Sequence, residues 1–233
     1  MSRPVLILRP QPGAEQSAEK ARAMGMDPVV APLFTIVPLA WEAPVPGIHD
    51  AILLTSANAA RHAGSAAERF STLPCFVVGE ATASAAREAG FTDVRTGPSD
   101  GGAAAVMMAE AGVKRALHLC GRDRIDLQAE GVCIDAVPAY GAEAASELPP
   151  EAGEALGEGA VVLVHSPRAG ARLAELVGER SRVTLAAISE AAAAAAGEGW
   201  AAKAVAPAPR DEALLELAAK LCNHAPPEGE HQA

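Results

Sequence analysis

The sequence predicts an α/β protein with two similar parallel-sheet domains, joined by a two-stranded hinge with a cleft between them. A short apolar run, a small polar turn and an Ala-rich helix start occur twice, at 51–63 and at 161–173. The same offset pairs FVVG at 76–79 with AAIS at 186–189, and an Ala-rich helix follows each. A repeat of roughly 110 residues is far longer than a solenoid unit and indicates two copies of one domain.

The first elements are a strand, a helix and a second, interrupted strand. Pro4–Pro10 is a near-continuous apolar run of the kind that forms a buried parallel strand, and Pro12 helps to end it. Ala14–Met24 has helical composition, and Gly25 closes this helix. Pro28–Leu39 is rich in β-formers but contains two internal prolines, which a central strand does not tolerate. We therefore expect this segment to leave one sheet and cross to the other domain.

The middle of the chain repeats a strand-then-helix pattern. Because strands alternate with helices, the sheets are expected to be parallel with helices on both faces. The predicted segments are strand–helix pairs at Ile48–Ala63 and Leu73–Gly90, a strand at Thr92–Gly97, a turn and helix at Pro98–Gly112, and strands at Arg115–Cys120 and Ala136–Tyr140.

The last part contains the second copy of the repeat. Its alanine run at 191–196 is a strong helix former. Residues 223–233, with two adjacent prolines and many polar residues, are expected to form a disordered tail. The predicted segments are a helix at Pro149–Gly157, strand–helix pairs at Val161–Val177 and Leu185–Gly197, a short strand at Ala204–Ala206 and a helix at Asp211–Leu221.

The order of the segments predicts that one domain is discontinuous. The opening strand, helix and strand have their counterpart at 115–140, at the end of the first repeat rather than at its start. The chain would therefore begin one domain, cross to the other and return. The predicted boundaries are 1–34 plus 146–222 for the discontinuous domain, 40–137 for the other, and 35–39 and 138–145 for the hinge crossings.

Composition excludes several classes of function. The formal net charge of −10 argues against nucleic acid or an anionic membrane as a bulk partner, although a site can be locally basic. No apolar run approaches the ~20 residues of a membrane-spanning helix, and the N-terminal run is too short for a signal peptide. The four cysteines show no zinc-like spacing and are expected to be reduced thiols in a cytoplasmic protein.

Ligands of parallel sheets bind at the carboxyl ends of the strands, where turns and helix N-termini lie. These N-termini carry free N–H groups and the positive ends of helix dipoles. The residues alone therefore predict a two-lobed protein suited to an anionic ligand, without naming that ligand.

Several of these strand ends together resemble the uroporphyrinogen-III synthase family. LRP closes the first strand, TSANA and HSPRA are paired strand ends, and VGEATA, a PSD turn and a VPAY crossing accompany them over residues 4–220. The resemblance implies a monomeric, cofactor-free enzyme with flavodoxin-like domains. It would convert hydroxymethylbilane to uroporphyrinogen III, inverting ring D with loss of water, through an azafulvene and a spiro-pyrrolenine. Transient contact with hydroxymethylbilane synthase is also expected.

The implied substrate carries eight carboxylates, which need donors spread over a wide cleft. Tyr140, the only tyrosine, lies on the crossing and matches a tyrosine of the family, so it is the expected acid or donor to the leaving hydroxyl. The expected substrate-binding residues are Arg9, Ser56, Asn58, Gly79, Thr82, Gly121, Arg122, Ser166 and Arg168.

Five of these residues also have a purely structural interpretation. Arg9 could bond carbonyls of the adjacent turn, Ser56, Thr82 and Ser166 could cap helices, and Tyr140 could be a packing residue of the hinge.

Three other polar residues are given no catalytic role. His165 precedes Ser166, but adjacent residues at a strand end point in opposite directions, which argues against a nucleophilic pair. Glu80 and Glu190 are interpreted as first-turn acids that the helix dipole favours.

The chain departs from the family at two strand ends. Ser189–Ala193 reads SEAAA where the family usually has Gly-x-Thr-Thr-Ala, and 120–123 reads CGRD where an Arg-Gly-Asp-like end is expected. The missing hydroxyls leave open a second hypothesis, a two-lobed ligand-binding relative with weak or no catalysis. A nucleotide-dependent enzyme is disfavoured because GxGxxG and GxxxxGK[ST] are absent. Metal-dependent hydrolysis is disfavoured for lack of a His/carboxylate cluster.

Overall fold

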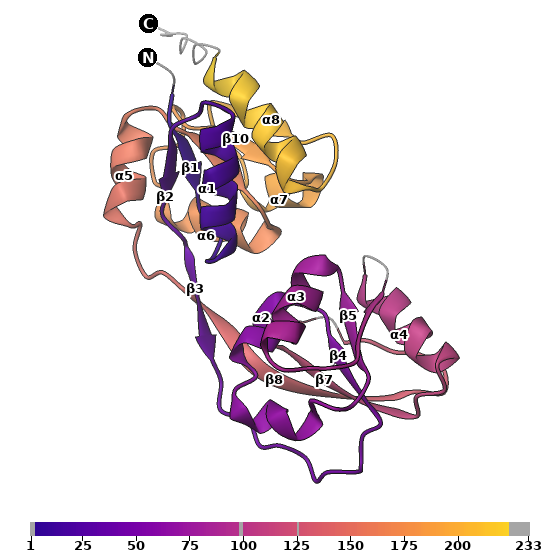
Figure 1. Cartoon of the computed structure of the whole chain (residues 1–233). Coiled ribbons are helices and arrows are strands. Elements are labelled where there is room, and N and C mark those ends of the chain that lie inside the picture. The colour runs from indigo at the N-terminus through magenta and orange to yellow at the C-terminus, as the bar shows by residue number, and fades with distance from the viewer. Residues whose placement is uncertain (1–2, 98–99, 125, 224–233) are drawn as a thin grey trace, which may run out of the picture. The chain divides into compact units, whose positions relative to one another are not determined.

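The computed structural model describes residues 3–97, 100–124 and 126–223. Pro98 and Ser99 of the expected turn, and all of the expected tail after Asn223, lie outside these residues. The chain forms two compact units (Figure 1). The first combines the residues up to Thr35 with those from Glu143 onward, and the second is Ile36–Ala142.

The first unit is built on a parallel sheet. The central strands are fully buried, which confirms the interpretation of their apolar runs. The strand order is β11-β10-β9-β1-β2, with bounds β1 Val5–Ile7, β2 Pro28–Val30, β9 Val161–Val164, β10 Thr184–Ala187 and β11 Ala202–Val205.

Small residues let helices approach this sheet closely. On one face, α1 presents Ala14, Ala18 and Ala21, and α8 adds Ala213 and Ala218 beside it. Figure 1 shows α1 and α8 side by side. The helices of this unit are α1 Gly13–Ala23, α5 Pro150–Gly157, α6 Pro167–Leu176, α7 Glu190–Ala195 and α8 Asp211–Cys222.

Helices α6 and α7 meet at Gly170, and enlarging this residue is expected to destabilise the first unit. A Cβ atom at this position would lie 2.6 Å from the carbonyl oxygen of Ala192 and 3.1 Å from the nitrogen of Ala196. Both are backbone atoms, so the helices would have to move apart. We expect Gly170→Ala to lower the free energy of unfolding by about 1–2 kcal/mol in a urea titration.

Gly153 provides the matched control. It lies within α5, where the nearest atom to a new Cβ, from Leu148, is 4.0 Å away. Gly153→Ala should therefore raise stability by about 0.5–1 kcal/mol through helix propensity. Equal effects of the two substitutions would contradict the tight contact between α6 and α7.

The second unit is built on a sheet that is parallel from β8 to β6. Pairing is parallel between β8 and β7, β7 and β4, β4 and β5, and β5 and β6. The strand order is β3-β8-β7-β4-β5-β6, with bounds β3 Phe34–Pro38, β4 Ala51–Leu54, β5 Cys75–Val78, β6 Val94–Gly97, β7 Arg115–Gly121 and β8 Cys133–Ala144.

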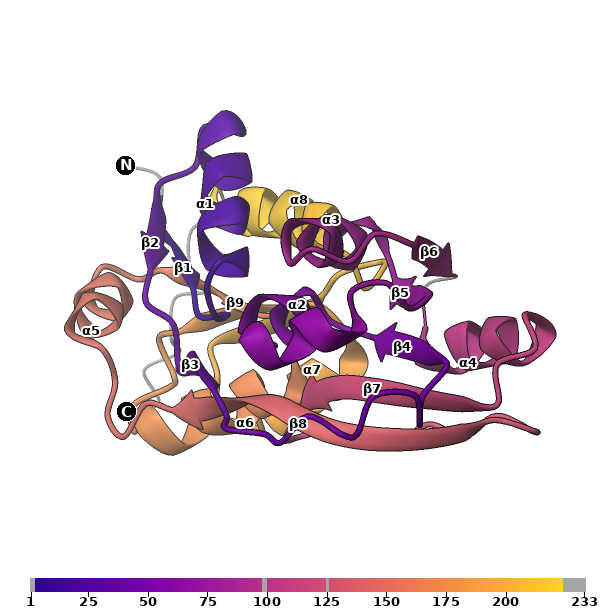
Figure 2. The same cartoon turned by 60° about the horizontal axis from the view of Figure 1, so that its bottom comes forward.

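Helices cover both faces of this sheet. Ile52 and Leu54 of β4 point into a core with α2, α3 and the 3-10 helix η1, whereas Leu53 points into a core with α4. This alternation is the period of two expected of a strand buried on both faces. Figure 2 shows α2 beside α3, with α4 apart from them. The bounds are α2 Ala57–His62, η1 Ser65–Phe70, α3 Glu80–Glu88 and α4 Gly101–Glu110.

The two proline-containing segments behave differently. Residues 28–39 form β2 and β3 in separate sheets, each at an edge, which confirms that this segment leaves one sheet for the other. By contrast, the strand expected at 136–140 is not broken by its proline, because β8 runs through Pro138 without interruption. The pairing with β7 shifts register between Cys120 and Gly121, opposite this proline. Such a bulge removes the need for the proline to donate a hydrogen bond there.

Among its described residues, the counterpart of residues 1–34 at 115–140 has no helix. Between β7 and β8 the described residues form a loop with one isolated bridge, from Ala129 to Val132. Most of the described residues in 122–130 are charged or polar, and they offer few small apolar side chains like those with which α1 covers its sheet. The expected correspondence therefore holds for the strands alone.

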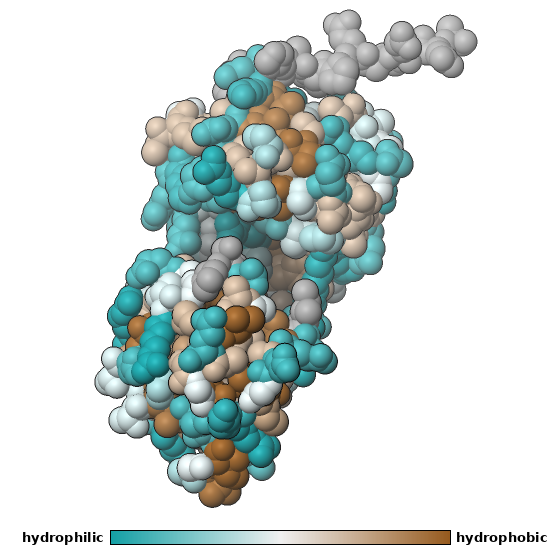
Figure 3. Space-filling model, turned by 90° about the vertical axis from the view of Figure 1, so that its right-hand side faces the viewer, coloured by the Kyte–Doolittle hydropathy of each residue, from teal (hydrophilic) through white to brown (hydrophobic). Residues whose placement is uncertain are grey.

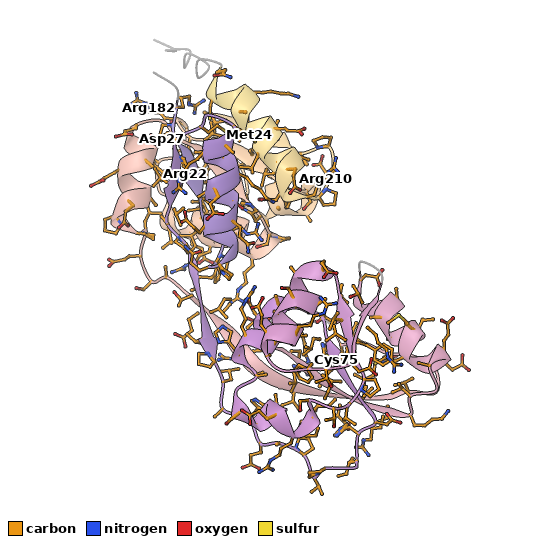
Figure 4. The ribbon with its side chains drawn as sticks, viewed as in Figure 1. Arg22, Met24, Asp27, Cys75, Arg182 and Arg210 are labelled. Atoms are coloured by element: carbon orange, nitrogen blue, oxygen red, sulfur yellow. The ribbon has the colours of Figure 1, made fainter. Side chains whose placement is uncertain are left out.

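On the face shown in Figure 3, hydrophilic and hydrophobic residues are interspersed. No helix among the described residues is long and apolar enough to span a membrane. All four cysteines are free, and only Cys133 is exposed. Burial raises the pKa of the Cys75 thiol to about 12, and Figure 4 shows this residue inside the second unit. The expectation of unpaired core and surface thiols is confirmed.

Candidate functional site

Each sheet has one point where the connections that follow two neighbouring parallel strands lead toward opposite edges of the sheet. In the first unit it lies between β1 and β9, and in the second between β4 and β7. Ligands of parallel sheets bind beyond the carboxyl ends of the strands at such points. The residues there include Arg9 and His165 in the first unit, and Thr55 and Gly121 in the second.

The two serines of the repeated motif cap helices. The Ser56 hydroxyl accepts a hydrogen bond from the Asn58 N–H at 3.2 Å, at the start of α2. The Ser166 hydroxyl accepts one from the Ala169 N–H at 3.1 Å, at the start of α6. The capping interpretation is thus confirmed for both. It leaves the substrate role open, because a helix N-terminus also attracts anions.

The strand end that lacks the family's threonines retains a hydroxyl. Ser189 caps α7, with its hydroxyl 3.3 Å from the Ala192 N–H. Ala192 is fully buried and Ala191 is exposed. Of the two positions where the family has threonine, only Ala191 therefore faces outward.

Helix α3 begins without a side-chain cap. Its N-cap is Gly79, whose φ of 75° is strained for other residues. Thr82 is 5% exposed and its hydroxyl makes no capping bond, so the capping interpretation is wrong for this residue. Its burial leaves little of the side chain accessible to a ligand. Glu80, in the first turn, pairs with Arg87 on the surface, which matches its expected structural role.

Tyr140 lies at the carboxyl end of β7 because a glycine makes room for it there. Gly121 is its partner across the strand pair, and a Cβ atom at Gly121 would lie 3.0 Å from the Tyr140 hydroxyl. The Tyr140 ring packs 6.3 Å from the His62 ring of α2, measured between centroids. Within the described residues, its hydroxyl makes no hydrogen bond. Tyr140 is half-buried, so its hydroxyl can donate a hydrogen bond to an acceptor on a bound ligand.

Arg122 lies beside Tyr140, and its side chain is likewise packed against a glycine. Its backbone N–H donates to the Tyr140 carbonyl at 2.8 Å, and a Cβ atom at Gly141 would lie 2.8 Å from its guanidinium. Three of the predicted site residues, Gly121, Arg122 and Tyr140, are thus brought together at one strand end.

Arg168 is exposed in the first turn of α6, as expected. Its guanidinium carbon lies 4.6 Å from the centre of the Phe34 ring. This cation–π contact orients a positive charge at the same end of the first unit as Ser166.

Arg9 contacts a carboxylate of the same unit. Its Nη1 lies 3.3 Å from Asp211 Oδ1 and 3.2 Å from the Ser17 hydroxyl. The alternative in which it bonds carbonyls of the adjacent turn is therefore wrong. Asp211 is the first residue of α8, directly after Arg210, which Figure 4 labels.

His165 is directed to Asp211 and not to Ser166. Its Nε2 lies 3.1 Å from Asp211 Oδ1, which confirms the argument against a nucleophilic pair with the serine. Burial lowers the pKa of His165, although Asp211 opposes this, so the imidazole is neutral at pH 7. Burial alone would raise the pKa of Asp211, but hydrogen bonds from its neighbours hold that pKa far below its usual range.

The sequence interpretation missed His118 of β7. Its Nε2 lies 3.1 Å from the Thr55 hydroxyl, where the connections after β4 and β7 lead toward opposite edges of the sheet. Burial lowers the pKa of His118 to about 4, with a further contribution from Arg124. The available signal was a histidine within the apolar run RALHLC. No group of three or more potential metal ligands occurs among residues 3–97, 100–124 and 126–223.

Comparison with known proteins assigns this geometry to a family. The family model of uroporphyrinogen-III synthase HemD matches residues 15–216. The chain belongs to the uroporphyrinogen-III synthase family. No curated protein matches it in a sequence search.

Solved structures of uroporphyrinogen-III synthases are similar in fold. The enzyme from Helicobacter pylori 26695 is 16% identical, with 95% of this chain and 100% of that chain covered and a TM-score of 0.66. A mutant synthase from the extremely thermophilic bacterium Thermus thermophilus is 15% identical, with coverages of 93% and 96% and a TM-score of 0.46. The first match confirms the predicted α/β fold with two parallel sheets.

Family membership gives the reaction. Uroporphyrinogen-III synthases are cyclising hydro-lyases of tetrapyrrole biosynthesis, and their substrate is hydroxymethylbilane. The chain therefore closes hydroxymethylbilane to uroporphyrinogen III with inversion of ring D and loss of water.

Proposed function

We propose that Tyr140 assists departure of the substrate hydroxyl and that strand-end donors of both units bind its carboxylates. The observation that carries this proposal is the Tyr140 hydroxyl, which lies against Gly121 without a hydrogen-bond partner in the described part of the chain. A half-buried phenol next to a strand end can donate a proton toward a bound ligand.

The proposed step breaks the carbon–oxygen bond of the hydroxymethyl group. The bond's electron pair leaves with the oxygen, which takes the Tyr140 proton and departs as water. The electrons of the pyrrole nitrogen replace the broken bond, and the azafulvene results when this nitrogen loses its proton, which returns to the Tyr140 oxygen. Ring D then attacks the new electrophilic carbon through its substituted position, and the spiro-pyrrolenine opens and recloses with the ring inverted.

The carboxylate donors would come from three arginines and the helix starts. Arg122 lies beside Tyr140 in the second unit, and Arg9 and Arg168 lie at strand ends of the first. Guanidinium groups bind carboxylates through paired, charge-assisted hydrogen bonds. The remaining proposed contacts are those at Ser56, Asn58, Gly79 and Ser166, with Thr82 contributing through the first turn of α3.

We further propose that the protein acts as a monomer in the cytoplasm. Hydroxymethylbilane closes spontaneously to the type I isomer, so a brief contact with hydroxymethylbilane synthase would limit this loss. Analytical ultracentrifugation of the protein with and without that synthase tests the monomeric state and the contact.

An isomer assay tests the proposed function. Porphobilinogen deaminase supplies hydroxymethylbilane, the protein is added, and the products are oxidised and separated as uroporphyrin isomers. We expect type III to dominate, and heat-inactivated protein to give type I. Type I alone with folded protein would contradict the function and favour a binding-only relative.

A further inference from the structure

The Asp211 carboxylate accepts hydrogen bonds from residues of α1 and from residues that follow β1 and β9 in the first unit. Its Oδ1 accepts from the Ser17 hydroxyl at 2.8 Å and lies 3.1 Å from His165 Nε2. Arg9 Nη1 lies 3.3 Å from the same oxygen, and Lys20 Nζ lies 3.2 Å from Oδ2. The Asp211 side chain is 13% exposed, so these contacts fix it rigidly. They join α1, α8 and the ends of β1 and β9 at the point where the two strands diverge.

The Arg9 guanidinium is held from two sides. Asp211 and Ser17 bond its Nη1, and Gly13 lies directly against the rest of the group. A Cβ atom at Gly13 would be 2.7 Å from Nε and 2.8 Å from Nη2. Any larger residue would therefore push the guanidinium out of this position.

Arg9 keeps donors for a ligand in this arrangement. A guanidinium has five N–H groups, and within the described residues the side-chain bonds of Arg9 come from Nη1 alone. Its side chain is 33% exposed. Lys20 pairs with both Asp211 and Glu212. The two positive charges of Arg9 and Lys20 therefore nearly cancel the two carboxylates, and the site does not repel a carboxylate of the substrate. The arrangement suits a carboxylate that approaches from solvent.

We propose that Asp211 is a positioning residue, which acts through Arg9 to bind one carboxylate of hydroxymethylbilane. This rests on the proposed role of Arg9 in the synthase reaction. Asp211 contributes no contact of its own to the substrate. It restricts the rotamers of Arg9, so that less conformational entropy is lost when the carboxylate binds.

A double-mutant cycle on Arg9 and Asp211 tests the proposal. Asp211→Asn should raise KM for hydroxymethylbilane about tenfold, with the loss falling on KM rather than on kcat. In an Arg9→Gln background the same substitution should have no further effect on KM, because Asp211 acts on the substrate only through the Arg9 guanidinium. Equal effects in both backgrounds would overturn the proposal. So would a lower KM in Asp211→Asn, which would mean that Asp211 competes with the substrate for Arg9.

Asp93→Asn is the matched control. Asp93 also bonds an arginine, Arg95, at 2.7 Å, but this pair lies on the surface at β6. Its loss should leave KM unchanged. If Asp211→Asn fails to fold, Gly13→Ala replaces it, since the new methyl group displaces the Arg9 guanidinium and leaves Asp211 intact.

Binding of uroporphyrin III separates this proposal from the proposed function. This stable oxidised product keeps all eight carboxylates, and its fluorescence gives Kd without turnover. We expect the same cycle in Kd as in KM. A wild-type protein that forms only type I refutes the function, whereas a Kd unaffected by Asp211→Asn refutes the positioning role.

Discussion

A Tyr140→Phe variant is expected to form uroporphyrinogen III about a hundredfold more slowly than the wild type, with KM little changed. The substitution removes only the hydroxyl that we propose as the proton donor, and general acid assistance contributes a factor of this order or more. The ring, and its packing against His62, remain. The measurement is the initial rate of type III formation over a range of hydroxymethylbilane concentrations.

Two further variants sharpen this test. Gly121→Ala keeps the hydroxyl but displaces it, because the new Cβ would lie 3.0 Å from it, and kcat should fall here as well. Trp41→Phe is the control. It removes another hydrogen-bonding group from an aromatic ring of the same unit, the indole N–H that donates to Ala63 at 2.9 Å. This control should retain kcat. A Tyr140→Phe variant with wild-type kcat would show that Tyr140 is a packing residue only.

Lowering the pH from 7 to 4 is expected to remove about 3 kcal/mol of unfolding free energy from the second unit through His118. The pKa of this histidine is about 4 in the folded protein and about 6.5 in the unfolded chain. Between these values the unfolded chain binds the proton and the folded chain does not. The contribution of His118 to the unfolding free energy is therefore fully present above pH 6.5 and is lost as the pH falls toward 4.

Tryptophan fluorescence can isolate this effect. The chain has two tryptophans, Trp41 in the second unit and Trp200 in the first, so a Trp200→Phe background reports the second unit alone. Urea titrations at several pH values then give the stability curve. His118→Gln keeps a polar partner for Thr55 but cannot titrate, and its curve should be flatter by about 3 kcal/mol over this range. Parallel curves for the two proteins would refute the assignment.

Local chemistry allowed much of this fold to be predicted. The strands at 5–7 and 161–164 follow from uninterrupted apolar runs, and the caps at Ser56 and Ser166 follow from a serine directly before an Ala-rich segment. Each of these features depends on residues that are neighbours in the sequence. A single sequence therefore contains the information needed to predict them.

Features that depend on distant residues were not predictable in this way. Asp211 is bonded by Ser17, which lies 194 residues earlier, and by Arg9, which lies 202 residues earlier. The packing of α8 beside α1 brings these groups together. Likewise, β8 continues through Pro138 because the shifted register of β7 accommodates it, and register is a property of the strand pair. Such contacts depend on packing rather than on local preference.

The alanine-rich contact between helices and sheet in the first unit has a consequence for folding. Alanine has no side-chain rotamers, so burying Ala14, Ala18 and Ala21 sacrifices no side-chain conformational entropy. Each buries less apolar area than a leucine would, and so contributes less hydrophobic free energy. The stability of this face therefore comes from many small contributions with little entropic opposition, and no single residue of α1 dominates it.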